Sequence, residues 1–86
     1  MTVYLVHLED MGEDGLNAHE HFIYDKLEDA KQKAQQLIQS YKNDCPDLFT
    51  DPNWVVEETD SSLRLYDDGY YDLNHIVIGI EQVEVQ

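Results

Sequence analysis

One stretch of the chain limits the fold more than any other feature, because it has the spacing of an amphipathic helix. In DKLEDAKQKAQQLIQSYKND the apolar residues recur at intervals of three and four, which places them in one stripe along a helix. These residues are Leu27, Ala30, Ala34, Leu37, Ile38 and Tyr41. The stripe predicts one helix, over about residues 26–42, whose apolar side must be covered by another layer.

Signals at both ends agree with this helix. Asp25, followed three residues later by Glu28, fits an N-cap with its reciprocal partner. Asn43 fits a left-handed residue that ends a helix, and Pro46 prevents its continuation. We therefore expect the helix to stop near residue 43.

The segments on either side of the helix are typical of strands. TVYLVHL and HEHFIYD precede it, separated by the acidic and glycine-containing loop EDMGEDGLN. After it comes an irregular connection, NDCPDLFTDPN, in which Leu48 and Phe49 are expected to pack under the sheet or the helix end. β-Prone runs then alternate with turn signals at Asp60-Ser61 and at Asp68-Gly69.

The last run, HIVIGIEQVEV, places Ile76, Ile78 and Ile80 on one face, with Gly79 as a candidate bulge. We predict a single α+β domain over residues 1–86. Its two layers are one helix and a mostly antiparallel sheet of four or five strands, with the helix packed on one face. The expected order is β-β-α-β-β, with a fifth strand optional at the end.

The charge of the chain is large and unevenly distributed. Nineteen acidic residues against five basic ones give a formal charge of −14. Residues 1–25 hold six acids and no base, residues 26–42 balance at +2, and residues 43–86 hold eleven acids against Arg64. Such a field repels nucleic acids and anionic lipid surfaces, and it attracts basic proteins and cations. We therefore expect no direct binding to nucleic acid or to membranes.

Two further observations concern compartment and redox chemistry. The first residues, MTVYLVHLED, show no basic region and no small-residue cleavage site, and no apolar run approaches the roughly 20 residues of a membrane span. We therefore expect a cytoplasmic protein. The single cysteine, Cys45, excludes an internal disulfide, and the acids around it argue against a reactive thiolate.

The stretch LYDDGYYDLNH concentrates aspartates and tyrosines around Gly69. It does not fit a helix–loop–helix calcium site, because its glycine stands third rather than sixth and its flanks are strands. A looser calcium site from Asp67, Asp68 and Asp72 stays open, although a tight turn with Asp68-Gly69 at its tip is the favoured interpretation. The turn does not account for the tyrosines, which with the aspartates make a half-apolar, half-anionic surface of the kind found at interfaces.

The tripeptide HEH places His19 and His21 on the same face of a strand. His7, on the neighbouring strand, can join them in a zinc site, although the fourth ligand would have to be His75 or a carboxylate. We keep this as an alternative and otherwise expect solvent-facing histidines that tune binding below pH 7. No cofactor or metal is predicted.

Catalysis is not predicted either. Carboxylate pairs occur throughout the chain, and a domain of this size offers little room for a pocket that shifts the pKa of a carboxyl group. Ser61-Ser62 has no nearby histidine, and there is no glycine-rich phosphate loop. The lysines of the helix spread around it instead of forming a phosphate-binding stripe.

The remaining feature is the array of carboxylates on the sheet and its loops. A rigid carboxylate array has the sign and charge density of a phosphate backbone, so it can occupy the groove of a nucleic-acid-binding protein. In size, charge and tyrosine content the chain is similar to small acidic proteins of phages and mobile elements that mimic nucleic acids, a class that includes anti-CRISPR and anti-restriction proteins. The resemblance implies a protein target with a basic groove, from which the positively charged helix would face away.

We therefore predict a non-catalytic binding module, or inhibitor, that docks on a basic protein surface. The expected contact residues are Glu57, Glu58, Asp60, Tyr66, Asp67, Asp68, Tyr70, Tyr71 and Asp72, with Glu9, Asp10, Glu13 and Asp14 of the first loop as further candidates. In antiparallel strands the Asp60 and Asp68 turns lie at opposite ends of their shared strand. Two alternatives stay open: acidity that serves only solubility, and a homodimer through an exposed sheet face.

Overall fold

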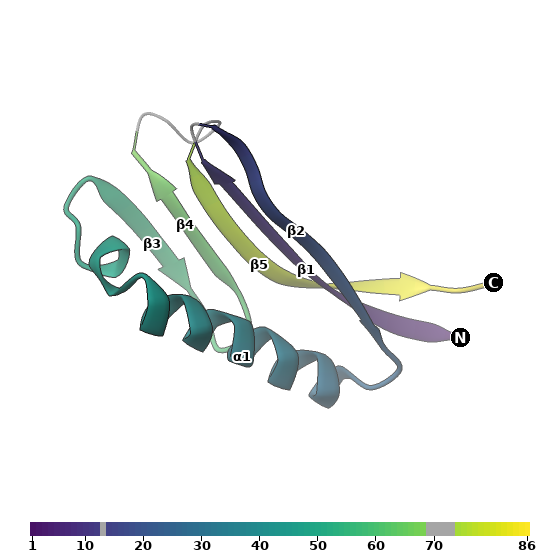
Figure 1. The fold of residues 1–86 in the computed structure, drawn as a ribbon. Coiled ribbons are helices and arrows are strands. Elements are labelled where there is room, and N and C mark those ends of the chain that lie inside the picture. Colours follow the sequence, from purple (N-terminus) through teal and green to yellow (C-terminus); the bar gives the residue numbers. More distant parts are fainter. Residues whose placement is uncertain (13, 69–73) are drawn as a thin grey trace.

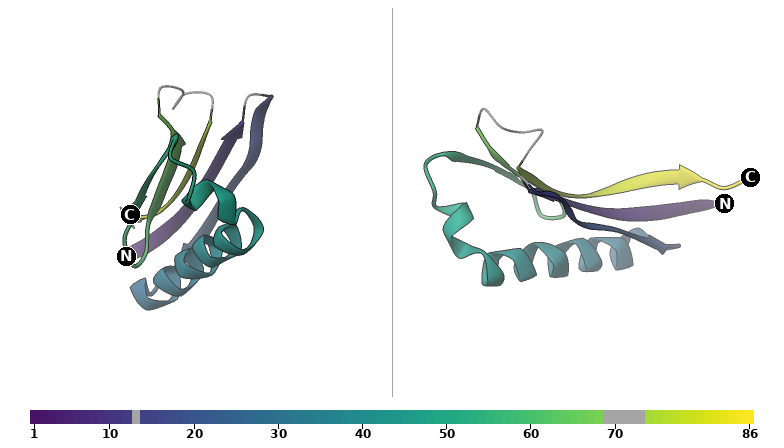
Figure 2. Two further views of the ribbon diagram at one scale, coloured as in Figure 1. Left: turned by 90° about the vertical axis from the view of Figure 1, so that its left-hand side faces the viewer. Right: turned by 45° about the horizontal axis from the view of Figure 1, so that its top comes forward.

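The fold is one antiparallel sheet with one long helix across it (Figure 1). The structure, a computed structural model, describes residues 1–12, 14–68 and 74–86. Its elements are β1 (Thr2–Gly12), β2 (Gly15–Tyr24), α1 (Leu27–Asp44), the short 3-10 helix η1 (Pro46–Phe49), β3 (Trp54–Glu58), β4 (Leu63–Asp67) and β5 (His75–Glu84). Figure 2 shows the helix and the sheet as two layers. The predicted α+β class, single helix and two layers are confirmed.

The prediction gave the order of the strands along the chain but not their order in the sheet. The fifth strand, which was optional in the prediction, is present, and the spatial order is β2-β1-β5-β4-β3. The first and last strands of the chain therefore pair in the interior of the sheet, and β2 and β3 form its two edges. Every pairing is antiparallel.

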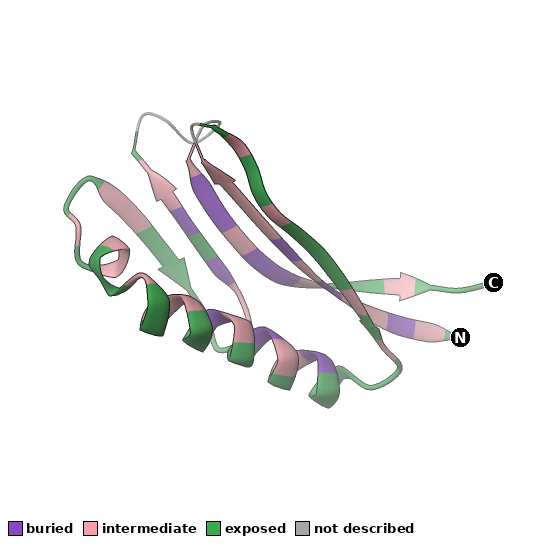
Figure 3. Cartoon of the chain, in the orientation of Figure 1, coloured by how far each residue is buried: buried purple, intermediate pink, exposed green. Residues whose placement is uncertain are grey.

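The core lies between α1 and the sheet (Figure 3). It consists of Val6, Leu8, Ala30, Ala34, Ile38, Leu63, Leu65, Ile76 and Ile78. Ala30 and Ala34 are completely buried, and because they lack long side chains they let the helix backbone approach the sheet closely. Leu48 and Phe49 pack against the border of this cluster, as predicted. Leu27, the first residue of the predicted stripe, is instead 40% exposed.

The start of the helix differs from the prediction. The N-cap is Lys26, in extended backbone, and no side chain caps the helix. Asp25 therefore lies one residue too early to act as the cap. Glu28 and Asp29 in the first turn still suit the positive end of the helix dipole.

The end of the helix is set by the proline. Asn43 remains helical, and its side chain accepts a hydrogen bond from Nε2 of Gln39 (3.0 Å). The helix stops at Cys45, whose backbone N–H donates to the carbonyl of Tyr41 (2.8 Å). A residue that precedes proline is disfavoured in helical backbone, so Pro46 ends the helix at Cys45 rather than at Asn43.

The first hairpin is tighter than the predicted loop. Most of EDMGEDGLN belongs to β1 and β2, and Gly12 pairs with Gly15 across the turn. Gly15 has φ +119°, a conformation that glycine adopts without strain. The pairing of β1 with β2 therefore extends to Gly12 and Gly15, further than the predicted loop allowed.

The predicted bulge at Gly79 is wrong. β1 and β5 stay in register through this position, where Gly79 faces His7, and the irregularity lies instead between Asp10 and Met11 in the β1–β2 pairing. A Cβ atom at residue 79 would lie 2.8 Å from Nε2 of His7. Glycine at this position therefore makes room for an imidazole ring.

Candidate functional site

One end of the sheet, which we call the loop end, collects residues 10–12, 14–15, 46–54 and 67–68 (Figure 1). Cross-strand pairs bring these segments to the same end: Met11 pairs with His75, His75 with Tyr66, and Trp54 with Asp67. Its described acids are Asp10, Asp14, Asp47, Asp51, Asp67 and Asp68. The lysines and the arginine of the chain stand at positions 26, 31, 33, 42 and 64, outside all of these segments. The described residues of these segments therefore include no basic residue, and one contact that a basic side chain makes with them is that of Lys42, whose Nζ lies 5.9 Å from the ring centroid of Phe49.

Hydrogen bonds fix the part of the loop end that carries Asp68. The backbone N–H of Asp68 donates to the carbonyl of Asn53 (3.0 Å). Asp51 accepts from the N–H of Asn53 through its carboxylate (2.9 Å) and from the N–H of Trp54 through its carbonyl (3.1 Å). Asp68 is exposed and Asp67 is half-buried. Two predicted contact residues are thus held on a fixed backbone, beside Asp51, which the sequence did not single out.

Asp10 has a structural contact with the helix. Its Oδ2 accepts a hydrogen bond from the phenol of Tyr41 (2.9 Å), and its Oδ1 accepts from Nδ2 of Asn17 (3.5 Å). Burial of the ring, together with the neighbouring carboxylate, raises the pKa of the Tyr41 phenol well above its ordinary value. This candidate from the first loop therefore holds α1 to β1.

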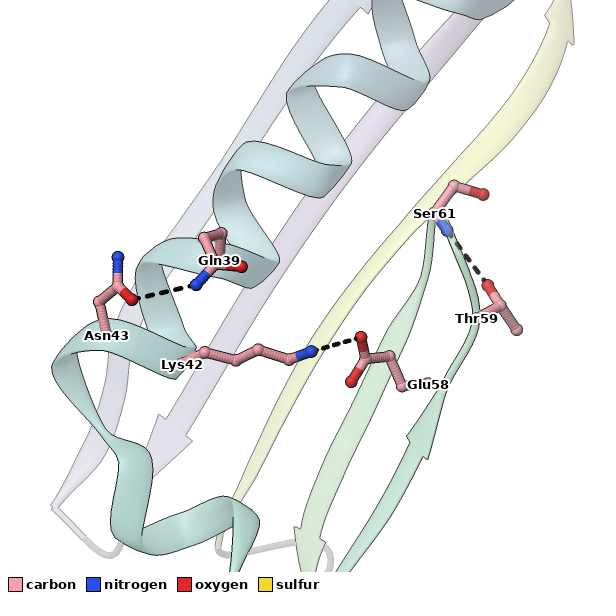
Figure 4. Close-up of polar contacts among 6 residues, drawn as sticks. All are labelled: Gln39, Lys42, Asn43, Glu58, Thr59 and Ser61. Carbon is pink, nitrogen blue, oxygen red and sulfur yellow. Dashed lines mark hydrogen bonds and ion pairs between the residues drawn. The ribbon is translucent and has the colours of Figure 1, made fainter.

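Glu57 and Glu58 do not belong to one acidic surface. Successive residues of a strand point to opposite faces, so the two carboxylates lie on different sides of the sheet. Glu58 contacts Nζ of Lys42 on the helix side (2.7 Å; Figure 4). Glu57 contacts Nη1 of Arg64 on the other side (3.3 Å). Both predicted contact residues are therefore compensated by a basic neighbour.

Asp60 is exposed in the β3–β4 turn, where the hydroxyl of Ser61 donates to its Oδ1 (3.4 Å). β4 separates this turn from Asp68, so the expectation that the two turns lie at opposite ends of one strand is confirmed. The predicted contact set is thus divided: Asp67 and Asp68 lie together at the loop end, and Asp60 lies at the far end of the same strand.

Tyr66 is half-buried on β4 and donates to Oε1 of Glu57 (3.2 Å). Desolvation and the Glu57 carboxylate raise the pKa of its phenol. The other predicted contact residues of this stretch lie outside the described residues; they are Tyr70, Tyr71 and Asp72, and the same holds for Glu13 of the first loop.

The face of the sheet opposite α1, which we call the open face, carries all four histidines of the chain. In the β1–β2 pairing His7 lies opposite His21, and Glu9 lies opposite His19. The rings of His19 and His21 pack edge to face, with centroids 4.6 Å apart. A hollow of about 350 Å³ lies over them and extends across β1 to Val77 and Glu81 of β5. The predicted common face of these histidines is confirmed.

His75 joins this group through the sheet register. It is 7% exposed, and its Nε2 lies 2.6 Å from Oε2 of Glu9. The sequence could not show this contact, because it depends on which residues of β1 and β5 are paired. Within residues 1–12, 14–68 and 74–86, no group of three or more His, Cys, Asp or Glu side chains is arranged to hold a metal ion.

Comparison with protein-family models, with curated proteins and with solved structures gave no match to this chain. Among the described residues, no helix has the length and apolar character needed to cross a membrane. The class that fold and surface define is a small, strongly acidic two-layer α+β domain. Any function must therefore be argued from its own residues.

Proposed function

We propose that this protein is a non-catalytic, cytoplasmic binding module that docks its loop end on a basic protein surface and blocks it. The partner would be a protein that binds nucleic acid, and the carboxylates would take the place of phosphates, as in a DNA mimic. This proposal keeps the acids at Asp67 and Asp68 as contact residues and assigns Glu57 and Glu58 to ion pairs within the domain.

The observation that carries the proposal is the separation of charge. Lys42 and Arg64 are engaged by Glu58 and Glu57. The other three basic residues, Lys26, Lys31 and Lys33, stand at the start of α1 or within it. The segments that form the loop end hold six described aspartates and no basic residue of their own. If the acidic residues served only solubility, no part of the surface would need to lack basic residues.

The fixed backbone of the loop end supports the same function. Asp51, Asn53 and Asp68 are joined by hydrogen bonds, so little conformational freedom is lost when a partner contacts them. Binding by such an array releases counterions and speeds encounter with a basic surface. Affinity for the partner is therefore expected to fall steeply as salt rises.

The first test is a pull-down with the tagged protein from a lysate of its native host, washed at low and then at high salt. We expect the high-salt eluate to contain a nucleic-acid-binding protein. The purified protein should then displace double-stranded DNA from that partner. A partner that stays bound at high salt, or that binds DNA and this protein together, contradicts the mimic proposal.

Two single substitutions locate the contact. Asp68→Lys and Asp60→Lys each change an exposed turn residue, and each alters the net charge equally, but they lie at opposite ends of β4. Because close interfacial charge pairs couple by about 1.5 kcal/mol or more, we expect D68K to weaken the partner's affinity about tenfold or more, and D60K to change it much less. Equal losses in the two variants would mean that only net charge matters.

A further inference from the structure

The two edges of the sheet are protected to different degrees. β3 is five residues long, follows Pro52 closely, and has Glu57 and Glu58 engaged in ion pairs. Short strands, prolines and charges are the usual means by which an edge avoids pairing with another chain. β2 is ten residues long, contains neither proline nor lysine, and within the described part of the chain pairs only with β1. β2 therefore presents a long row of backbone groups on its free side.

The side chains of this edge are also exposed (Figure 3). Ile23 is 69% exposed and Leu16 is 51% exposed, which is unusual for large apolar residues near the two ends of one strand. A strand added to β2 would lie about 4.8 Å away and would cover the edge-facing sides of both residues.

Two hollows flank β2, one on each side of the sheet. On the open face, the hollow of about 350 Å³ is bordered by His19 and His21 of β2. On the helix side, a hollow of about 400 Å³ lies between Tyr24 of β2 and α1. An added strand sends alternate side chains to the two faces, so each set would find a hollow on its own side.

The charge around β2 favours a basic occupant. Asp14 precedes the strand, Glu20 stands near its middle, and Asp25 follows it, and all three are exposed. Residues 1–25 contain six acids and no lysine or arginine. A second copy of the chain would bring its own charge of −14 against this edge, so like charges oppose self-pairing.

The two hollows differ in charge. The hollow on the open face is bordered by the carboxylates of Glu9 and Glu81, with no lysine or arginine in its lining. The hollow on the helix side contains Lys33 as well as Asp29, and Nζ of Lys33 lies 4.3 Å from the ring centroid of Phe22. Glu20, which pairs with Leu8 and therefore faces the helix side, adds a second acid there, but only the open-face hollow has acids without a basic residue. Basic side chains therefore suit the open face, and neutral ones suit the helix side.

We propose that the free edge of β2 is a strand-addition site for an extended basic segment of the partner, with basic residues at alternate positions facing the open face. This inference rests on the proposed function, because it specifies how part of a basic partner is held. Backbone hydrogen bonds to β2 supply affinity, and the alternation of basic and neutral side chains supplies specificity.

The test uses a synthetic peptide of the length of β2 in which lysine alternates with valine, capped at both ends. Hydrogen exchange of the ¹⁵N-labelled full chain is followed by NMR with and without the peptide. At a peptide concentration ten times the Kd, exchange of the alternate β2 amides that do not bond to β1 should slow by about tenfold. A peptide of alternating lysine and proline has similar charge but cannot form the ladder, so it should give no such protection.

Two variants separate this inference from the proposed function. Glu81→Lys reverses the charge of an exposed carboxylate that borders the open-face hollow and should weaken the lysine–valine peptide by about tenfold, whereas Asp68→Lys at the loop end should weaken it less. If the peptide binds without protecting β2, and D68K weakens it more than E81K, the strand-addition site is wrong while the acidic binding function stands. If the peptide does not bind at low salt, the strand-addition site at β2 is also wrong. The pull-down experiment then tests the proposed binding function independently. Concentration-dependent protection of β2 without peptide would show that a second copy is the occupant, and it would overturn the basic-segment assignment.

Discussion

The two faces of the sheet are built from alternate residues of the same strands, yet they have different compositions. The face under α1 contains the apolar core, and two of its carboxylates are held by the helix: Asp10 by Tyr41 and Glu58 by Lys42. The open face carries the four histidines together with partly exposed apolar residues such as Leu5 and Val77. One face supplies stability, and the other leaves polar side chains such as His19 and His21 exposed to solvent.

The two faces also differ in their charged and histidine side chains. By the strand register the described charged groups of the open face are Glu9, Glu57, Glu81 and Arg64, a formal charge of −2 with neutral histidines. The core face has no histidine.

The largest expected effect on the free energy of unfolding comes from truncating a core leucine, and the matched comparison is a leucine on the open face. Leu65→Ala, at a completely buried core position, should lower the free energy of unfolding by about 2–5 kcal/mol. Leu5→Ala, at a half-exposed position on the open face, should cost less than about 1.5 kcal/mol, because less apolar area is lost. Urea denaturation of both variants measures the difference. Equal losses would contradict the division of roles between the faces.

The hydrogen bond from Tyr41 to Asp10 should give the next largest effect. Tyr41→Phe removes a bond to a charged acceptor, so we expect a loss of about 1.5–3 kcal/mol in the free energy of unfolding near neutral pH. The control is Tyr24→Phe, because the Tyr24 hydroxyl makes no hydrogen bond to the described residues, and it should cost less.

The raised pKa of Tyr41 gives this effect a pH dependence. The folded protein keeps the phenol protonated at pH values where the unfolded chain, with the ordinary pKa of 10.0, loses the proton. The contribution is therefore complete below pH 10 and declines as the pH rises above it. Unfolding of the wild type and of Y41F, compared at about pH 8 and pH 11, should show a smaller difference at the higher pH. A constant difference would contradict the assigned role of Asp10.

The two ion pairs, one on each face, should give the smallest effects. Lys42→Met and Arg64→Met each remove the basic partner of a glutamate whose side chain is 31% or 49% exposed. Surface pairs contribute about 0–1 kcal/mol, so we expect small losses, with the larger one for Lys42 because its pair is shorter and less exposed. Added salt should reduce both losses. A loss above about 2 kcal/mol at Arg64 would contradict the smaller contribution of the open face to stability.

Most of the helix and the local strands could be predicted from sequence, because they depend on periodicities within short segments. Ala30, Ala34 and Ile38 occupy the predicted stripe and form the helical part of the core. Leu27 fits the same spacing but remains exposed, because it lies at the start of the helix. The pairing of β1 with β5 could not be predicted, since local patterns do not specify contacts between the two ends of a chain.

The candidate site shows the same difference between local features, which the sequence predicts, and long-range contacts, which it does not. The common face of His19 and His21 and the opposite placement of Asp60 and Asp68 come from the period of a strand, and both were predicted correctly. The partner of Glu58 is a helix residue sixteen positions earlier in the chain, so its neutralisation could be seen only in three dimensions. The same is true of the contact between His75 and Glu9.

The pairing of β1 with β5 has a consequence for how the chain folds during synthesis. β1, β2 and α1 are made first, and the β3–β4 hairpin follows, but no ladder joins these two parts until residues 75–84 are available. Until then β1 and β4 each have an open edge, and small isolated sheets of this kind are marginally stable. The sheet is therefore completed in one late step, and a growing chain that lacks its last strand exposes the edges that most readily pair with other chains.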